Sequence, residues 1–224
     1  MKTLVIDVGG THVKALVTGR RVPVKIDSGP DMTPRQMVKQ VRAATETWTY
    51  DRISIGFPGP VRDGRALQEP WNLGPGWVGF NFRRAFGKPV RVLNDAAMQA
   101  LGSYRGGRML FLGLGTGLGS AMVMAHLLIP LELAHLPYRA GKSYEAWLGD
   151  GSMKRRGKHR WRAHVLRVAD LFTAAFQVDY VVLGGGNARH MKSLPAHVRL
   201  GSNANAFTGG FRMWDHELGL RTPR

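Results

Sequence analysis

The stretch "VIDVGGTHVKALV", residues 5–17, joins two apolar runs through a pair of glycines and places a carboxylate just before them. The apolar runs have the composition of short strands, and Gly9-Gly10 marks the turn between them. Because glycine has no Cβ, the backbone N–H groups of such a turn can approach an anion closely. Asp7 could then position Mg²⁺ through water, and Lys14 could face the same anion. An ordinary hairpin explains the same residues, so both interpretations stay open at this point.

Alternating strand and helix signals continue through the first half of the chain. We expect strands at 3–8, 12–19, 21–26, 52–57 and 89–95, and helices at 33–48 and 96–104. The first three strands should form an antiparallel meander. The later alternation of strands with helices predicts a sheet with crossover helices.

The second half restarts this pattern at "FLGLGTGLGSAMV", residues 111–123. We expect strands at 108–115, 119–125, 126–131 and 179–187, and helices at 143–149, 158–176 and 203–218, the last interrupted at Gly209-Gly210. The longest helix should bury one face, made of Trp161, Val165, Val168, Phe172 and Ala175. We therefore predict two α/β lobes, 1–104 and 105–224, with a boundary near 102–106, and a last helix that can pack back on the first lobe.

Glycines gather at two further places. Gly113, Gly115, Gly117 and Gly119 alternate around Thr116, although each glycine weakens a strand by roughly 0.5–1 kcal/mol. Close approach of a ligand explains them better than packing, and a phosphate cradle is the natural interpretation. The loop matches neither the Walker pattern nor a dinucleotide fingerprint. The third cluster, Gly184 to Asn187, could let a base or ribose lie against the backbone, or could be a turn with Asn187 as a helix N-cap.

Two sets of titratable residues lie near these loops. Asp95 ends a strand where a helix starts, so it could act as a general base in the cleft of an α/β fold or simply cap the helix. In "LELAHLPYR", residues 131–139, Glu132 and His135 lie among apolar neighbours. Taken alone, they fit a buried ion pair or a satisfied polar pair in the core as well as a ligand site.

Composition adds a charge argument. The formal net charge is +17, which favours a polyanionic partner such as nucleic acid, acidic lipid or polyphosphate, although simple solubility explains it equally well. The run from Lys154 to Arg167 holds seven of these cations and no acid. Without cysteine the chain can form neither disulfides nor cysteine-ligated zinc sites. No segment resembles a signal peptide or a membrane span, so we expect a soluble protein, compatible with the cytoplasm.

Taken in order, "DVGGTHVK", "NDAAMQALG", "LGTGLGS", "ELAH" and "LGGGN" resemble the ROK sugar kinases, which have the two-lobed actin-like ATPase (ribonuclease H-like) fold. The resemblance covers nearly the whole chain and implies an interlobe active site with Asp95 as the base that deprotonates a sugar hydroxyl. It implies phosphate binding at Asp7, Gly9, Gly10, Thr11, Lys14, Gly115, Thr116 and Gly117. It implies sugar binding at Gly59, Asn72, Asn94, Asp95, Glu132, His135 and Glu145, and a nucleotide side at Gly184, Gly185, Gly186 and Asn187.

Departures from the family pattern point to one branch. Ala134 replaces the glycine of the family's E-x-G-H motif, and the usual cysteine-rich zinc motif is missing, so we expect no zinc. The zinc-free form resembles the polyphosphate glucokinases. The expected reaction transfers phosphate from polyphosphate or ATP, with Mg²⁺, to a hexose, most simply glucose. Lys154, Arg155, Arg156, Lys158 and Arg160 could then form a polyphosphate track, or only a solvated surface.

Alternatives to this reaction remain. Another hexose or an N-acylhexosamine could be the acceptor, and a sugar-sensing or nucleic-acid-binding regulator is a different class. Regulators of this family carry a helix-turn-helix segment ahead of the kinase-like part, and here the first phosphate loop begins at residue 7, so we do not expect nucleic acid binding. The resemblance further implies a homodimer, and the lack of a long apolar run predicts no membrane partner.

Overall fold

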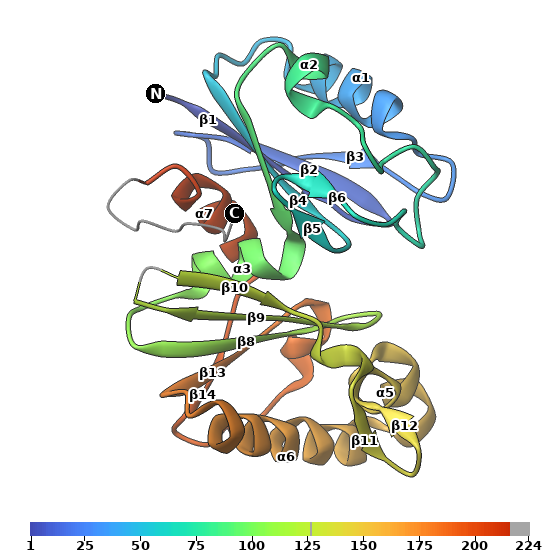
Figure 1. Cartoon of the computed structure of the whole chain (residues 1–224), viewed down its shortest axis with the longest axis vertical. Coiled ribbons are helices and arrows are strands. Elements are labelled where there is room, and N and C mark those ends of the chain that lie inside the picture. The colour runs from blue at the N-terminus through green and yellow to red at the C-terminus, as the bar shows by residue number, and fades with distance from the viewer. Residues whose placement is uncertain (126, 216–224) are drawn as a thin grey trace.

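The computed structural model describes residues 1–125 and 127–215. Its first half forms a five-stranded sheet in the order β3-β2-β1-β4-β7 (Figure 1). The strands are β1 (Thr3–Val8), β2 (His12–Val17), β3 (Val24–Asp27), β4 (Arg52–Phe57) and β7 (Val90–Asn94). β1, β2 and β3 pair antiparallel, as the meander predicted, and β1, β4 and β7 pair parallel. The helices α1 (Pro34–Ala44) and α2 (Phe82–Phe86) cover the outer face of this sheet.

The second half repeats this topology in the order β10-β9-β8-β13-β14. The strands are β8 (Arg108–Leu114), β9 (Leu118–Met124), β10 (Leu127–Leu131), β13 (Tyr180–Gly184) and β14 (Val198–Leu200). β10, β9 and β8 pair antiparallel, and β8, β13 and β14 pair parallel. The helices α4 (Tyr144–Leu148), α5 (Asp150–Arg156) and α6 (Lys158–Phe176) lie on the side away from the first sheet (Figure 1). The shared topology explains why the second half of the sequence restarts the strand pattern of the first half.

Shorter elements connect these layers. They are β5 (Val61–Arg62), β6 (Arg65–Ala66), β11 (Pro137–Arg139), β12 (Lys142–Ser143) and the 3₁₀ helices η1 (Leu133–His135) and η2 (Gly186–His190). The chain passes from the first sheet to the second between Ser103 and Arg108. None of the helices in the described ranges is both long and apolar enough to cross a membrane.

Two helices, α3 (Asp95–Ser103) and α7 (Asn205–Arg212), lie between the two sheets (Figure 1). They cross at glycines, because a side chain at Gly102 would overlap the carbonyl oxygen of Asn205, and one at Gly209 would overlap that of Met98. The predicted interruption at Gly209-Gly210 is therefore wrong: α7 runs through both glycines, which are buried. Residues 216–218 of the predicted last helix lie outside the described residues.

The α7 region is also fastened to the first sheet. Ser54, fully buried on β4, donates its hydroxyl to the carbonyl oxygen of Gly210 at 2.6 Å. The indole Nε1 of Trp214 in turn donates to the Ser54 hydroxyl at 2.8 Å. The segment from α7 to Trp214 thus packs against both the first sheet and α3.

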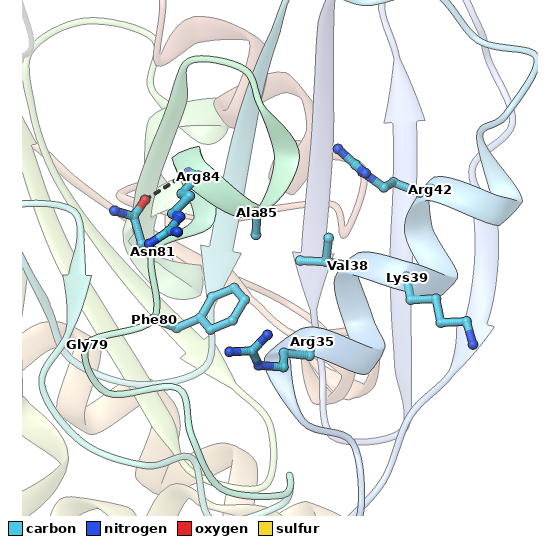
Figure 2. Close-up of a pocket in the computed structure, with 9 residues that line it drawn as sticks. All are labelled: Arg35, Val38, Lys39, Arg42, Gly79, Phe80, Asn81, Arg84 and Ala85. Atoms are coloured by element: carbon cyan, nitrogen blue, oxygen red, sulfur yellow. Dashed lines mark hydrogen bonds between the residues drawn. The ribbon is translucent and has the colours of Figure 1, made fainter.

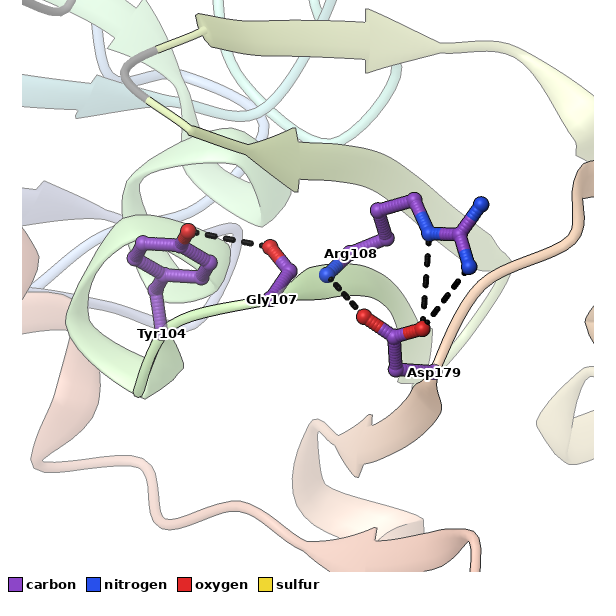
Figure 3. Close-up of polar contacts among 4 residues, drawn as sticks. All are labelled: Tyr104, Gly107, Arg108 and Asp179. Carbon is purple, nitrogen blue, oxygen red and sulfur yellow. Dashed lines mark hydrogen bonds and ion pairs between the residues drawn. The ribbon is translucent and has the colours of Figure 1, made fainter.

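The start of β8 is clamped to the start of β13 (Figure 3). The backbone N–H of Arg108 donates to Asp179 Oδ2 at 2.7 Å, and the Arg108 guanidinium donates to Oδ1 at 3.0 Å. These hydrogen bonds, the backbone one foremost, lower the pKa of Asp179. Gly107 has a φ of +71° and a Cβ there would approach Asp179 Oδ2 to 2.7 Å, so the position favours glycine. The Tyr104 hydroxyl closes the same turn by donating to the Gly107 carbonyl at 2.9 Å.

Element boundaries differ from prediction at a few ends. The helix expected at 33–48 stops at Ala44, where the Thr45 side chain donates to the Val41 carbonyl at 2.8 Å and the helix is capped. On α6, Trp161 is buried as expected, but Ala175 is exposed and Ala169 lies in the core in its place. The helical face turns slightly from the one that simple spacing predicts.

Candidate active site

A cavity of about 580 Å³ opens between the two sheets. Elements of both halves line it: the turn after β1, the loop before α2, the β7–α3 junction, the β8–β9 turn and η1. Of the residues predicted from the sequence, it is lined by Gly9, Gly10, Gly59, Asn72, Asn94, Asp95, Gly115, Thr116, Gly117, Glu132, His135, Glu145 and Gly185. Residues spread over most of the chain therefore converge on one space.

Asp95 is the first residue of α3 and lies in this cavity. Its Oδ1 accepts a hydrogen bond from the backbone N–H of Ala96 at 2.7 Å. Burial, and then the negative charges of Asp7 and Glu132, raise the pKa of Asp95 to about 7, although the Ala96 hydrogen bond opposes this. A carboxyl group with that pKa suits proton abstraction near neutral pH.

Asn94 rather than Asp95 caps α3. Its Oδ1 accepts from the N–H of Ala97 at 3.1 Å, while its Nδ2 donates to the carbonyl of Gly59 at 3.1 Å. The two bonds hold the Gly59 loop to the β7–α3 junction. One N–H and one lone pair of the Asn94 amide are thus used within the protein, and its predicted contact with a sugar would use the second N–H or the second lone pair of Oδ1.

Asp7 is the next-to-last residue of β1 and pairs with Lys14 in the β1–β2 register. The Lys14 ammonium lies 4.0 Å from Asp7 Oδ2. Burial raises the pKa of Asp7 and the Lys14 charge opposes it. In the adjoining turn, a Cβ on Gly10 would come within 2.6 Å of the Asn72 Cβ, so this glycine lets the loop before α2 close over the turn. Thr11, also predicted for phosphate, is exposed beside the turn.

Packing explains part of the second glycine loop. A Cβ on Gly117 would overlap the carboxylate of Glu145, and one on Gly119 would approach the Ala96 Cβ to 2.7 Å. The backbone N–H of Leu118 also reaches Glu145 Oε2 at 3.4 Å. Gly115, in contrast, faces open space. Packing therefore explains Gly117 and Gly119 without a ligand. At Gly115 packing gives no reason for a glycine, so close approach of a phosphate remains the explanation there.

Glu132 and His135 are exposed, so the buried-pair interpretation is wrong. Between them Leu133 and Ala134 are buried in the core of the second lobe and anchor η1. Ser120 adds a second anchor, since its hydroxyl accepts from the Leu133 N–H at 3.2 Å and donates to the Leu131 carbonyl at 2.9 Å. The apolar neighbours thus fix the backbone while the two polar side chains face the cavity.

The third glycine cluster adjoins the β8–β9 loop. Gly185 lines the cavity with a φ of +78°, and a Cβ there would overlap the backbone of Leu114. Asn187 does not cap η2, because its Nδ2 donates to the Gly115 carbonyl at 3.3 Å and to Asp150 Oδ1 at 3.4 Å. The predicted nucleotide side is therefore tied to the second phosphate loop, with Gly184 and Gly186 flanking Gly185.

The cationic run at α5 and α6 does not line the cavity. The Lys154 ammonium pairs with Asp150 at 2.6 Å. The Arg156 guanidinium lies 3.6 Å from the centre of the Trp147 ring, which is a packing role. Arg155, Lys158 and Arg160 are exposed. Arg156 therefore has a role in packing, and the polyphosphate track stays a prediction for the exposed cations Lys154, Arg155, Lys158 and Arg160.

Several cavity residues could not be predicted from the sequence. Glu69 accepts from the N–H groups of Trp77 and Val78 at 3.0 and 3.1 Å and so shapes the loop before α2. On that loop Trp71 lines the cavity while 98% exposed. Gln99, one turn into α3, presents a buried Oε1 that has no hydrogen-bond partner among the described residues. A large aromatic residue next to Asn72 was the available signal for Trp71, whereas Gln99 gave none.

Known proteins share the sequence pattern and the fold of this chain. The sequence pattern of the ROK family matches residues 3–129. Polyphosphate glucokinase of Mycobacterium tuberculosis is 27% identical over 82% of this chain and 77% of its own length. The inorganic polyphosphate/ATP-glucomannokinase of Arthrobacter sp. superposes with a TM-score of 0.78 at 20% identity, over 97% of this chain and 98% of that one. The ROK family glucokinase of Streptomyces griseus, solved with glucose and AMPPNP, gives 0.71 at 18% identity, over 95% and 99%. The fold is that of the actin-like ATPases.

Proposed function

Because this chain belongs to the ROK family, we propose that it is a sugar kinase that transfers a phosphoryl group to a hydroxyl of a hexose, most simply glucose, with Asp95 as the general base. The observation that carries the proposal is the Asp95 carboxyl, held in a cavity lined by both lobes with a pKa of about 7. The similarity to polyphosphate glucokinase supports the acceptor and the phosphoryl donor. In the reaction, Asp95 takes the proton of the attacking hydroxyl while the new O–P bond forms and the phosphoanhydride bond of the donor breaks.

Glu132, His135 and Glu145 supply the hydroxyl contacts in this proposal. Carboxylates and an imidazole are suitable hydrogen-bond partners for sugar hydroxyls. All three line the cavity, and Glu145 is held in place by its contact with the Gly117 loop. Asn72 reaches the same space from the first lobe. Binding would therefore draw on both lobes, which fits a closure that excludes water from the donor.

The donor phosphates would lie on the two glycine loops, at Gly9-Gly10-Thr11 and Gly115-Thr116-Gly117. Mg²⁺ fits this site chemically, since Asp7 and Asp95 are neighbouring carboxyls with raised pKa values that a cation would relieve. Asp7 would hold the ion through water, and the ion would neutralise charge on the donor phosphates. The described residues contain no group of three or more potential protein ligands, consistent with an ion held mainly by phosphates and water.

Substitution of the base tests the core of the proposal. Asp95→Asn should lower kcat by about 10²–10⁴-fold, the usual contribution of a general base, while calorimetry still detects sugar binding. The asparagine keeps the size of the side chain, so the fold should be preserved. Substantial remaining turnover would remove Asp95 from this role.

A coupled assay that crosses several sugars with ATP and polyphosphate identifies the substrates. We expect the highest kcat/KM with glucose. Preference for an N-acylhexosamine would keep the kinase but change its acceptor, and turnover with ATP alone would remove polyphosphate as donor. No turnover with any pair, together with tight sugar binding, would favour a sugar-sensing regulator. A homodimer is expected from the resemblance alone, and light scattering tests it.

A further inference from the structure

A second cavity, of about 760 Å³, lies on the outer face of the first lobe between α1 and α2, apart from the active-site cavity (Figure 2). Figure 2 shows Arg35 and Arg42 reaching from α1 and Arg84 placed on the α2 side. The nonpolar part of the lining is Val38, Ala85 and Phe80. We call this surface the α1–α2 groove; its full lining is Arg35, Val38, Lys39, Arg42, Gly79, Phe80, Asn81, Arg84 and Ala85.

The groove carries four cations and no acid. An adjoining hollow of about 420 Å³ shares Asn81 and Arg84 with it and adds Arg83 and Lys88. Within the described residues, no carboxylate lies within ion-pair distance of any of these six cations. Such a concentration of like charge is unfavourable for the folded chain unless it meets an anion.

The groove has features of a formed surface. Asn81 accepts from the Arg84 N–H at 2.8 Å and starts α2, and Arg42 Nη2 donates to the Phe86 carbonyl at 2.9 Å, which ties α1 to the end of α2. Arg35 and Arg84 make no side-chain hydrogen bond among the described residues, so both guanidinium groups are available. A guanidinium group binds phosphate oxygens through paired N–H donors.

We propose that the α1–α2 groove binds a linear chain of phosphate groups without bases, of the inorganic polyphosphate class. Cations spaced along two joined hollows match a repeating anion better than a single phosphate. A nucleic acid would need surfaces for its bases, and the groove offers one half-buried aromatic ring, Phe80. The proposal concerns a surface outside the active-site cavity and does not depend on which donor the kinase uses.

The test compares two charge-matched variants. Arg35→Gln/Arg84→Gln removes two charges from the groove, whereas Lys2→Gln/Arg21→Gln removes two exposed charges elsewhere on the same lobe. Arg42 stays, because its hydrogen bond supports the fold. Anisotropy of end-labelled polyphosphate is measured at several salt concentrations, and kinase activity with ATP and glucose, or with whichever pair the protein turns over, reports that the active site is intact.

We expect the groove variant to lose about tenfold in affinity for polyphosphate at low salt. The magnitude of its slope of log K against log salt should decrease by about 1.4, because two phosphate contacts are lost at ~0.7 each. The matched variant should change less than twofold. Equal losses in the two variants, or no loss in either, would overturn the proposal. A larger loss for single-stranded DNA of the same phosphate number than for polyphosphate would also overturn it, in favour of a nucleic acid.

Discussion

The pKa of Asp95 predicts how activity depends on pH. The base must be ionised to accept a proton, and burial with the charges of Asp7 and Glu132 puts its pKa at about 7. We therefore expect kcat/KM to rise about tenfold per pH unit below 6.5 and to level off above 7.5. Glu132→Gln removes one of the charges that raise this pKa and should shift the rising limb to lower pH. A limb that stays in place would mean that Glu132 does not act on the base.

The same pKa predicts a stability effect. Between pH 4 and 7 the unfolded chain has ionised Asp95 while the folded chain still binds its proton, so folded stability falls as pH rises through this window. Asp95→Asn removes that cost. At pH 8 the variant should unfold at a higher temperature than the wild type. Its free energy of unfolding should be larger by at most about 4 kcal/mol, because each unit of pKa shift corresponds to about 1.4 kcal/mol. The difference should vanish near pH 4; a variant that is less stable at both pH values would contradict the burial argument.

Trp71 is the most exposed tryptophan side chain of the described residues and lies at the rim of the active-site cavity beside Asn72. Aromatic rings are favoured where one face packs on a ligand, and the C–H face of a hexose is such a surface. Trp71→Ala should raise the KM for sugar about tenfold with a smaller change in kcat. We also expect sugar to change the tryptophan fluorescence of the wild type, and the variant should lose this change. Val78→Ala, on the same loop and also exposed, is the control and should leave both unchanged.

At the scale of elements, the crossing of α3 and α7 depends on glycine. Gly209→Ala would place a methyl group against the Met98 carbonyl, so the helices must separate, and we expect a loss of about 1–3 kcal/mol or more in stability. Gly151→Ala is the matched control, since it lies in α5 where a Cβ meets only the flexible end of Arg155. It should gain about 0.5–1 kcal/mol from helix propensity. Thermal unfolding of both variants measures the contrast, and equal shifts would show that propensity alone acts at Gly209.

This crossing also shows where the sequence stops predicting the fold. The strand at 52–57 and the helix at 158–176 have the predicted ends, because unbroken apolar patterns and clear breakers define them locally. Gly209-Gly210 suggested an interruption, since glycine is a poor helix former, but its reason is the partner helix, which no local pattern reveals. Tertiary contact overrides propensity at that point.

The active site divides in the same way. Asp95, Glu132 and His135 could be predicted because their motifs occur in a characteristic order, and the structure brings them to one cavity. Their surroundings could not be predicted. The sequence does not show that the Asn94 amide donates to the Gly59 carbonyl, or that a side chain at Gly117 would overlap the Glu145 carboxylate. These contacts join residues far apart in the chain, and only the folded arrangement defines them.

At the scale of the whole molecule, charge is divided between surface and cavity. The chain has 15 acidic residues against 32 basic ones, yet Glu69, Asp95, Glu132 and Glu145 all line the active-site cavity and Asp7 adjoins it. If the donor is a polyanion, as proposed, the basic surface would attract it from a distance, and the acidic cavity would oppose its final approach unless Mg²⁺ accompanied it. Because a hexose is uncharged, its binding should depend little on either charge distribution.

Salt should therefore separate the two substrates. Raising KCl from 50 to 200 mM should increase the KM for polyphosphate at least tenfold, because the donor displaces counterions, while the KM for sugar changes less than twofold. ATP, with fewer charges, should fall between the two. Initial rates at saturating Mg²⁺ measure all three, with ionic strength set by KCl so that chelation of the metal does not interfere. If the KM values for sugar and polyphosphate rise together, salt is acting on the fold or on lobe closure, and the basic surface does not select the donor.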